Sequence, residues 1–116
     1  MFMRLVLVGL SHKTAPIEAR ERLAALPAAS LYARIKDAGW GGAVVLSTCN
    51  RFEVLLSDTR KPAEEMRRWL ADLLGELTGS AVTPWLYAHE DGAAVERLFR
   101  VASGLESLVI GDAEIL

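Results

Sequence analysis

The chain is predicted to fold as an α+β domain with the ferredoxin-like split βαβ arrangement. The prediction rests on short apolar runs typical of strands, on amphipathic helical segments between them, and on their order: strand, helices, strand, strand, helix, strand, helix. We expect an antiparallel sheet with helices packed on one face, and one domain over residues 1–116. With 52% hydrophobic and 24% charged residues, the composition is that of an ordinary globular unit.

The first half of the chain begins with a strand and ends with a hairpin. Its predicted elements are a strand at 3–10, helices at 17–26 and 30–38, and strands at 43–48 and 52–57. The first strand is almost wholly apolar, as expected for a strand covered on both faces. Pro16 suits the first turn of a helix, and a glycine-rich stretch ends the second helix. In the last strand Phe52, Val54 and Leu56 share one face.

The second half contains the most regular helical pattern. One apolar stripe recurs at i, i+3, i+4 and i+7, formed by Met66, Trp69, Leu70, Leu73, Leu74 and Leu77. A short strand is predicted at 82–88, at a sheet edge because Pro84 lacks an N–H donor. An acidic turn at 89–92 then precedes another amphipathic helix. The chain ends on an apolar Ile-Leu pair, which predicts a helix continuing beyond residue 116.

The net charge and the cysteine content limit the kinds of partner and the cellular location that we expect for the protein. The net charge is -2, so a nucleic-acid partner would need a local basic patch. Basic residues gather at 20–22 and 60–68, although such runs are usually solvated helix faces. The N-terminal apolar run at 5–10 is too short for a membrane span or a signal sequence, and a single cysteine makes no internal disulfide. We therefore expect a cytoplasmic protein without a membrane partner.

The only cysteine, Cys49, stands at the tip of the predicted hairpin. A lone cysteine is often buried as a small hydrophobe. Here Thr48, Asn50 and Arg51 surround it with polar groups that can orient a carbonyl or an amine, and the nearby positive charge favours a reactive thiolate. Arg51 has a second use, because its planar fork binds a carboxylate through two hydrogen bonds. The residues alone leave both an inert thiol and a nucleophile open.

Cofactor and metal motifs are missing from the sequence. Its nine glycines never form the G-x-G-x-x-G pattern or a phosphate-binding loop. One cysteine and two distant histidines, His12 and His89, give no metal-ligand spacing. We therefore expect no metal, and no dinucleotide bound to this chain through those motifs.

Three blocks of sequence resemble a known family. They read Gly-Leu-Ser-His-Lys-Thr-Ala-Pro at 9–16, Leu-Ser-Thr-Cys-Asn-Arg at 46–51 and Leu-Phe-Arg-Val-Ala-Ser-Gly-Leu-Glu-Ser-Leu-Val-Ile-Gly at 98–111. In this order, and across nearly the whole chain, they resemble the N-terminal catalytic domain of glutamyl-tRNA reductase.

The resemblance implies the first step of five-carbon tetrapyrrole synthesis, which leads to porphyrins and haem. In that step glutamyl-tRNA and NADPH give glutamate-1-semialdehyde and free tRNA. The thiol of Cys49 would attack the aminoacyl ester and form a thioester, which hydride then reduces. The resemblance also implies substrate contacts at Thr48, Asn50, Arg51, Ser107, Asp112, Ala113 and Glu114.

The resemblance further implies parts that this chain lacks. These are the NADPH domain and a C-terminal segment through which the enzyme forms a homodimer; the aminotransferase that uses the semialdehyde is a further expected partner. Without a hydride donor, we expect the chain alone to act at most as a transacylase or an esterase.

The chain departs from the family pattern at Arg97 and at three positions of its last block, 111–116. The family usually carries a histidine, important for activity, where this chain has Arg97, so Arg97 is a candidate for stabilising negative charge instead of transferring a proton. The family's Gly-Glu-Pro-Gln-Ile-Leu reads Gly-Asp-Ala-Glu-Ile-Leu at 111–116. Arg97 and the acidic balance favour an alternative function, a noncatalytic module that binds tRNA or protein and in which Cys49 is structural.

Overall fold

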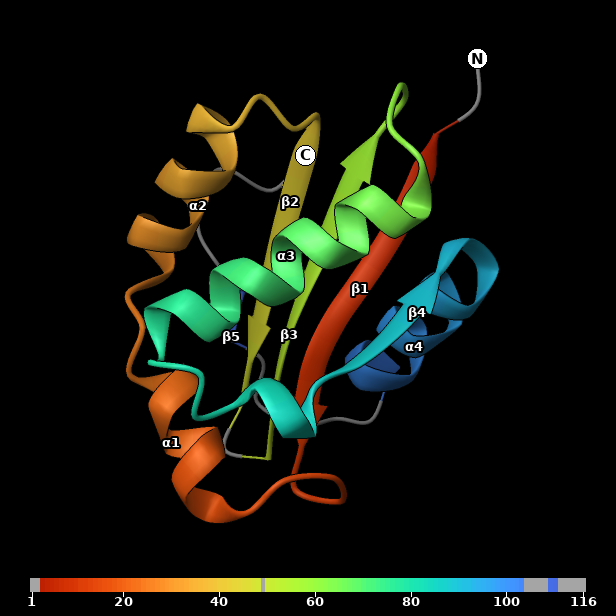
Figure 1. Cartoon of the computed structure of the whole chain (residues 1–116). Coiled ribbons are helices and arrows are strands. Elements are labelled where there is room, and N and C mark those ends of the chain that lie inside the picture. The colour runs from red at the N-terminus through yellow and green to blue at the C-terminus, as the bar shows by residue number, and fades with distance from the viewer. Residues whose placement is uncertain (1–2, 49, 104–108, 111–116) are drawn as a thin grey trace.

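Five strands form one antiparallel sheet in the order β4-β1-β3-β2-β5 (Figure 1). The computed structural model describes residues 3–48, 50–103 and 109–110. Its strands are β1 (Arg4–Ser11), β2 (Gly42–Ser47), β3 (Arg51–Asp58), β4 (Tyr87–Glu90) and β5 (Val109–Ile110). The order of the first four is that of a split βαβ layer, which confirms the predicted α+β class. The two-residue strand β5 is an addition that the sequence pattern does not signal.

Three helices cover one face of the sheet and a fourth covers the other (Figure 1). The helices are α1 (Ile17–Ala24), α2 (Ala28–Asp37), α3 (Ala63–Leu77) and α4 (Asp91–Ser103). We expected helices on one face only, and α4 departs from that expectation. The physical reason is the apolar character of both faces: Leu7 and Leu55 point away from α3, and Ala94 of α4 packs against them.

The main core lies between the sheet and α1–α3. Val6 and Val8 of β1 and Val54 of β3 are at most 1% exposed, and they belong to the same cluster as Leu70 and Leu74 of α3. Because β1 contributes to this core through alternate residues and to the smaller cluster through Leu7, it is covered on both faces, as its apolar run predicts.

The segment before α4 differs from the prediction of a strand at 82–88. A 3-10 turn spans Thr83–Trp85, β4 includes the first two residues of the acidic turn expected at 89–92, and the other two begin α4. Pro84 explains the turn, because its fixed φ suits the first positions of a helical turn. The chain then reverses at Asp91, whose φ is 48° and whose side chain accepts a hydrogen bond from the N–H of Leu5 at 3.0 Å.

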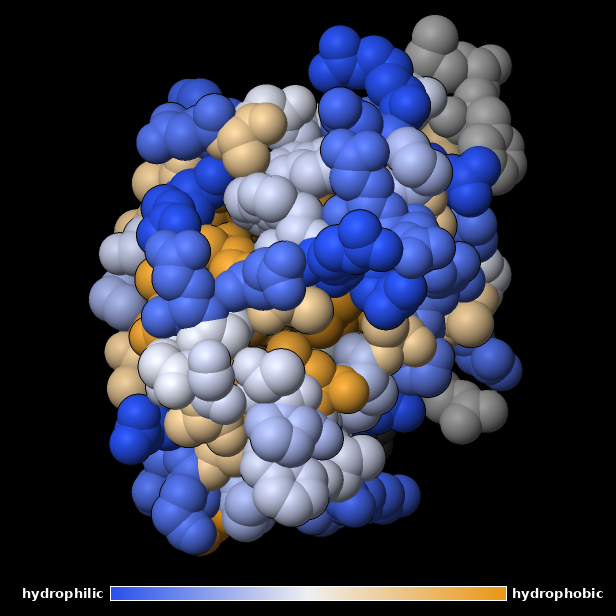
Figure 2. Space-filling model, in the orientation of Figure 1, coloured by the Kyte–Doolittle hydropathy of each residue, from blue (hydrophilic) through white to orange (hydrophobic). Residues whose placement is uncertain are grey.

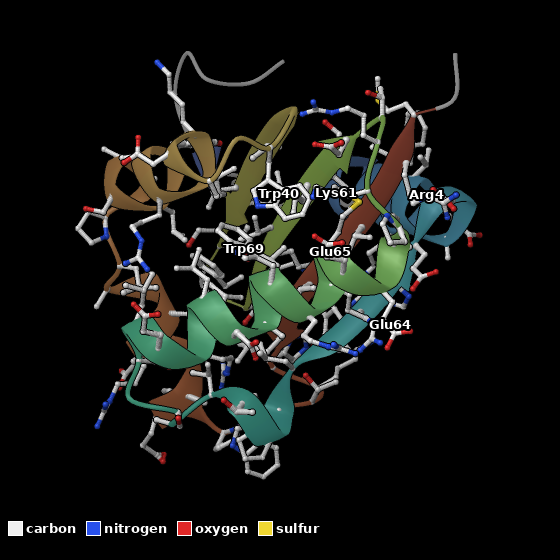
Figure 3. The ribbon with its side chains drawn as sticks, turned by 45° about the horizontal axis from the view of Figure 1, so that its top comes forward. Arg4, Trp40, Lys61, Glu64, Glu65 and Trp69 are labelled. Atoms are coloured by element: carbon white, nitrogen blue, oxygen red, sulfur yellow. The ribbon has the colours of Figure 1, made fainter. Side chains whose placement is uncertain are left out.

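The outer surface of α3 is charged and internally balanced. Hydrophilic side chains cover most of the face seen in Figure 2. Lys61 lies 3.4 Å from Glu65, and Arg68 lies 2.8 Å from Glu64, both at i,i+4 spacing (Figure 3). This pairing favours a solvated helix face over a nucleic-acid surface for the basic run at 60–68. None of the helices described is long and apolar enough to cross a membrane.

Beneath this charged surface, two tryptophans join α3 to the loop that precedes β2. The rings of Trp40 and Trp69 lie 5.5 Å apart at an interplanar angle of 56° (Figure 3). Tilted aromatic pairs of this kind add to the stability gained from burial. Trp69 therefore belongs to the packing stripe that the helical spacing predicts.

Asp58, at the end of β3, is expected to stabilise the fold in a pH-dependent way. Its side chain is 3% exposed and accepts hydrogen bonds from the N–H groups of Arg60 at 2.8 Å and Gly41 at 3.2 Å. The Arg60 bond is the main reason why the pKa of Asp58 lies below its usual value of 3.8, although burial opposes it. Replacing Asp58 by asparagine should destabilise the protein by about 1–2 kcal/mol at pH 7, because one acceptor is lost.

The pH dependence follows from the direction of this shift. Because the native pKa is the lower one, the stabilisation is complete above the unfolded pKa of about 4 and is lost as the pH falls through the native value. Urea unfolding of wild type and Asp58→Asn at pH 7 and pH 3 should therefore show a smaller difference at pH 3. An equal difference at both pH values would rule out the carboxylate as its source.

Candidate active site

The turn between β2 and β3 is held by a threonine. The N–H of Thr48 donates to the carbonyl of Arg51 at 2.9 Å, and the Thr48 hydroxyl accepts from the N–H groups of Asn50 and Arg51 at 3.2 Å each. A short hydroxyl side chain suits this position because it replaces a missing backbone acceptor within the turn. Cys49, between them in sequence, lies outside the described residues.

Two segments distant in sequence meet this turn. The N–H of His12, in the loop after β1, donates to the carbonyl of Asn50 at 2.7 Å. On the other side, β5 pairs its Val109 with Ser47, one residue before Thr48. Parts of all three sequence blocks singled out above therefore converge on one end of the sheet.

A buried charged cluster lies just behind the turn. Glu53 of β3 is 0% exposed, and its Oε2 accepts hydrogen bonds from Nε of Arg97 at 2.9 Å and from the hydroxyl of Tyr87. An Nη atom of Arg97 donates to the same hydroxyl at 2.9 Å. Nη1 of Arg51 lies 3.5 Å from Glu53 Oε2, and within the described part of the chain Glu53 Oε1 is buried without a partner.

Gly9 provides the space for this cluster. In the strand register Gly9 stands between Glu53 of β3 and Tyr87 of β4, and the two side chains meet across it. A Cβ at position 9 would lie 2.2 Å from the carbonyl oxygen of Phe52 and 2.7 Å from Cγ of Glu53. Only glycine fits this close approach.

The protonation states in the cluster follow from burial and from its hydrogen bonds. Burial, and then the hydrogen bond to Glu53, raise the pKa of Tyr87 well above its usual value of 10.0. For Arg97, burial acts to lower the pKa, but the hydrogen bonds to Glu53 and Tyr87 outweigh it and the net shift is upward. Tyr87 therefore remains a neutral donor while Arg97 stays charged.

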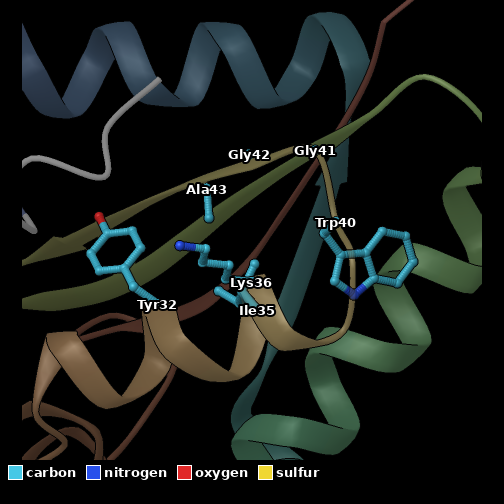
Figure 4. Close-up of a pocket in the computed structure, with 7 residues that line it drawn as sticks. All are labelled: Tyr32, Ile35, Lys36, Trp40, Gly41, Gly42 and Ala43. Atoms are coloured by element: carbon cyan, nitrogen blue, oxygen red, sulfur yellow. The ribbon is translucent and has the colours of Figure 1, made fainter.

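Two hollows on the surface differ in the residues that line them. One, of about 320 Å³, lies between α1 and the start of β3 and is bordered by Thr48, Arg51 and Phe52. The other, of about 310 Å³, lies between α2 and the start of β2 (Figure 4). The hydroxyl of Tyr32 in its lining already accepts a hydrogen bond from the N–H of Val45 at 2.8 Å. Of these two hollows, the one beside the turn is bordered by the polar residues Thr48 and Arg51.

The predicted site residues divide into those described and those outside the described part. Thr48, Asn50 and Arg51 come together in the turn, and Arg97 reaches the same end of β3 through Glu53. Their contacts with a substrate remain predictions. Predicted site residues outside the described part are Cys49, Ser107, Asp112, Ala113 and Glu114.

Sequence reasoning missed Glu53 and Tyr87 as members of the site. A signal for Glu53 was present, since it is a lone carboxylate within the otherwise apolar run at 52–56, and a buried charge is retained only with partners. Tyr87 carried no comparable signal. Within the described residues, no group of three or more histidine, cysteine or acidic side chains could hold a metal ion.

Comparison with known proteins agrees with the three sequence blocks. The model of the family described as "Glutamyl-tRNAGlu reductase, N-terminal domain" matches residues 8–116. Glutamyl-tRNA reductases of Shewanella frigidimarina and Geobacter metallireducens are each 42% identical to this chain, over 98% of its length and 27% of their own. The solved structure of glutamyl-tRNA reductase from Methanopyrus kandleri is 35% identical, with a TM-score of 0.63, and the match covers 89% of this chain and 23% of that one.

The chain thus spans about a quarter of the length of these relatives. The family model covers nearly all of the chain, and the likeness in fold extends over 89% of it. This chain belongs to the glutamyl-tRNA reductase family, as its N-terminal domain.

Proposed function

We propose that this domain takes the glutamyl group from glutamyl-tRNA onto the thiol of Cys49. The thiolate attacks the carbonyl carbon of the aminoacyl ester, and a carbon–sulfur bond replaces the carbon–oxygen bond to the tRNA. The tRNA leaves as an alcohol with one proton gained. An ester to tRNA is already activated, so a thiolate needs little acid assistance in this step.

Recognition of the glutamyl side chain is assigned to Arg51. Its guanidinium carries a permanent charge and presents paired donors that match a carboxylate. The Arg51 side chain is 16% exposed and forms one ion pair, with Glu53 at 3.5 Å; among the described residues its guanidinium makes no hydrogen bond, so it retains donors for a substrate carboxylate. Thr48 and Asn50 would orient the carbonyl or the amine from the same turn.

The observation that carries this proposal is the convergence at the turn. The loop after β1, the β2–β3 turn and β5 meet at one end of the sheet, and Arg51 stands there beside a buried cluster with excess positive charge. A rigid hairpin that displays polar groups next to a low-dielectric charged cluster suits the recognition of an anionic acyl group.

The remaining steps belong to a longer protein. In the function we propose, NADPH is held by another domain and supplies the hydride that converts the thioester into glutamate-1-semialdehyde, the first intermediate of five-carbon tetrapyrrole synthesis. We further propose a cytoplasmic homodimer whose dimer contacts lie outside this chain, with the aminotransferase that consumes the semialdehyde as a partner.

The test is a single-turnover incubation of the chain with glutamyl-tRNA, followed by intact and peptide mass spectrometry. We expect a glutamyl adduct on the peptide that contains Cys49, labile to hydroxylamine as a thioester is. Glutaminyl-tRNA should react far more slowly, because its side chain offers no carboxylate to Arg51. A wild-type chain without any adduct would contradict the assignment of the nucleophile.

The alternative is a binding module in which Cys49 is structural. That Arg97 is engaged with Glu53 favours it, because a side chain held in this way is not free to assist a reaction. Alkylation by iodoacetamide at pH 7 separates the two functions. A nucleophilic Cys49 should react faster than the same thiol in the urea-unfolded chain, whereas a structural thiol should react more slowly.

A further inference from the structure

Arg97 reaches from α4 down onto the sheet. It lies one helical turn after Ala94, which packs on Leu7 and Leu55, and this packing sets where the guanidinium can go. Its side chain is 25% exposed, its Nε lies 2.9 Å from Glu53 Oε2, and its guanidinium carbon lies 4.9 Å from the centre of the Tyr87 ring. Arg97 is thus held at the cluster by an ion pair, a hydrogen bond and an aromatic face.

The cluster contains two guanidinium groups and one carboxylate. Oε2 of Glu53 already accepts from Arg97 and Tyr87, and Arg51 stands farther off, at 3.5 Å. Since Tyr87 is neutral, the cluster carries one excess positive charge. Arg51 forms the longer of the two ion pairs with Glu53 and is not hydrogen-bonded to it, so it is the more weakly held cation.

We propose that Arg97 is a positioning residue that hydrogen-bonds Oε2 of Glu53 and so keeps the guanidinium of Arg51 at its longer distance from Glu53, available to a substrate carboxylate. Because the proposed function makes that carboxylate the glutamyl side chain, this inference rests on it. Without Arg97, Arg51 would be the only cation left at Glu53. Its existing ion pair with Glu53, at 3.5 Å, would then shorten to a direct hydrogen bond, since a buried carboxylate is costly when it lacks a close positive partner.

The experiment measures binding without the covalent step. The chain carries Cys49→Ser throughout, so that no acyl transfer occurs, and 15N spectra follow the arginine Nε–H signals. The probes are the α-methyl esters of L-glutamate and L-glutamine, which differ only in the side-chain carboxylate. We expect the glutamate ester to bind more tightly and to shift the Arg51 signal.

Replacing Arg97 by alanine should weaken binding of the glutamate ester about tenfold, equivalent to about 1.4 kcal/mol. Binding of the glutamine ester should stay unchanged. The Arg51 signal of the ligand-free variant should move, because Arg51 would then hydrogen-bond Glu53 instead of lying 3.5 Å from it. Arg97→Lys should restore most of the affinity. Arg68→Ala is the matched control, since it removes a guanidinium that pairs with an exposed carboxylate, Glu64 of α3, away from the cluster, and it should leave the preference for the glutamate ester intact.

A double-mutant cycle with Glu53→Gln tests whether Arg97 acts through Glu53. In the Glu53→Gln chain, loss of Arg97 should have little further effect, because no carboxylate remains to capture Arg51. An equal loss in both backgrounds would show that Arg97 contacts the ligand itself, and no loss in either would show that it has no role. Both results would overturn the inference.

Two further controls distinguish failure of this inference from misfolding of the variant and from failure of the proposed function. If Arg97→Ala does not give a dispersed amide spectrum, Arg97→Gln replaces it in the same comparisons, because it keeps a hydrogen-bond donor of similar reach without the charge. A wild-type chain that takes no glutamyl group from tRNA would contradict the proposed acyl transfer. The preference for the glutamate ester and its dependence on Arg97 could still be measured, because the binding experiments use chains with Cys49→Ser and need no acyl transfer.

Discussion

Replacement of Cys49 by serine is expected to reduce transfer of the glutamyl group to the protein by roughly 10⁴-fold or more, the scale seen when an enzyme loses its nucleophile. A serine hydroxyl needs an adjacent general base to become nucleophilic, whereas a thiol supplies some thiolate at neutral pH without one. The measurement is single-turnover transfer from glutamyl-tRNA with radiolabelled glutamate, at protein concentrations well above that of the tRNA.

Ser47→Ala is the matched control for this experiment. Ser47 is a small polar residue two positions earlier, and its described role is backbone pairing with Phe52 and Val109. Its replacement should change the transfer rate by no more than about twofold, as for substitutions that break no buried contact. A Cys49→Ser protein that transfers the glutamyl group as fast as wild type would place the nucleophile elsewhere.

Replacement of Gly9 by alanine is expected to destabilise the domain by about 3 kcal/mol or more, at or above the upper end for overpacked cores. The added methyl group would lie 2.2 Å from the carbonyl oxygen of Phe52, which belongs to the backbone of the neighbouring strand. Because backbone cannot rotate aside as a side chain can, β1 and β3 must separate. The same methyl group meets Cγ of Glu53, so the contact between Glu53 and Tyr87 should be lost as well.

Urea unfolding followed by tryptophan fluorescence measures this loss as a lower midpoint at an unchanged m-value. Gly92→Ala is the matched control, because a Cβ at Gly92 in α4 meets nothing within 4 Å. There the change should be between zero and a gain of about 1 kcal/mol, from the lower entropy of the unfolded chain and the higher helix propensity of alanine. Equal stability of the Gly9→Ala and wild-type chains would contradict the close strand approach at Gly9.

Local patterns predicted most of the secondary structure because the deciding interactions lie within a few residues. The stripe from Met66 to Leu77 fixed α3, and the apolar run from residue 3 fixed β1. The pattern fails at 82–88, where Pro84 predicts an edge strand but lies in a 3-10 turn, Thr83–Trp85. Proline has no N–H group and is therefore compatible with an edge strand and with a 3-10 turn. Only the antiparallel pairing of Tyr87–Glu90 with β1 shows where the strand begins.

The residues of the site also divide into those that the sequence could predict and those that it could not. Thr48, Asn50 and Arg51 were predictable because they are consecutive with Cys49 and the hairpin brings them together. Glu53 and Tyr87 were not, since they are separated by 34 residues and meet only because the sheet order places β1, with Gly9, between them. Arg97 was noticed for its departure from the family pattern, but its ion pair with Glu53 depends on how α4 crosses the sheet.

The class of fold, the family and the Ser-Thr-Cys-Asn-Arg turn can be predicted from periodicity, residue types and short motifs. The position of α4 on the second face of the sheet, and the pairing of Arg97 with the buried Glu53 beside Arg51, follow from the packing of the elements. A buried carboxylate takes its partners from the elements that pack over it, and those elements are distant in sequence. The separation of Glu53 and Arg97 in the sequence therefore does not predict that they form an ion pair.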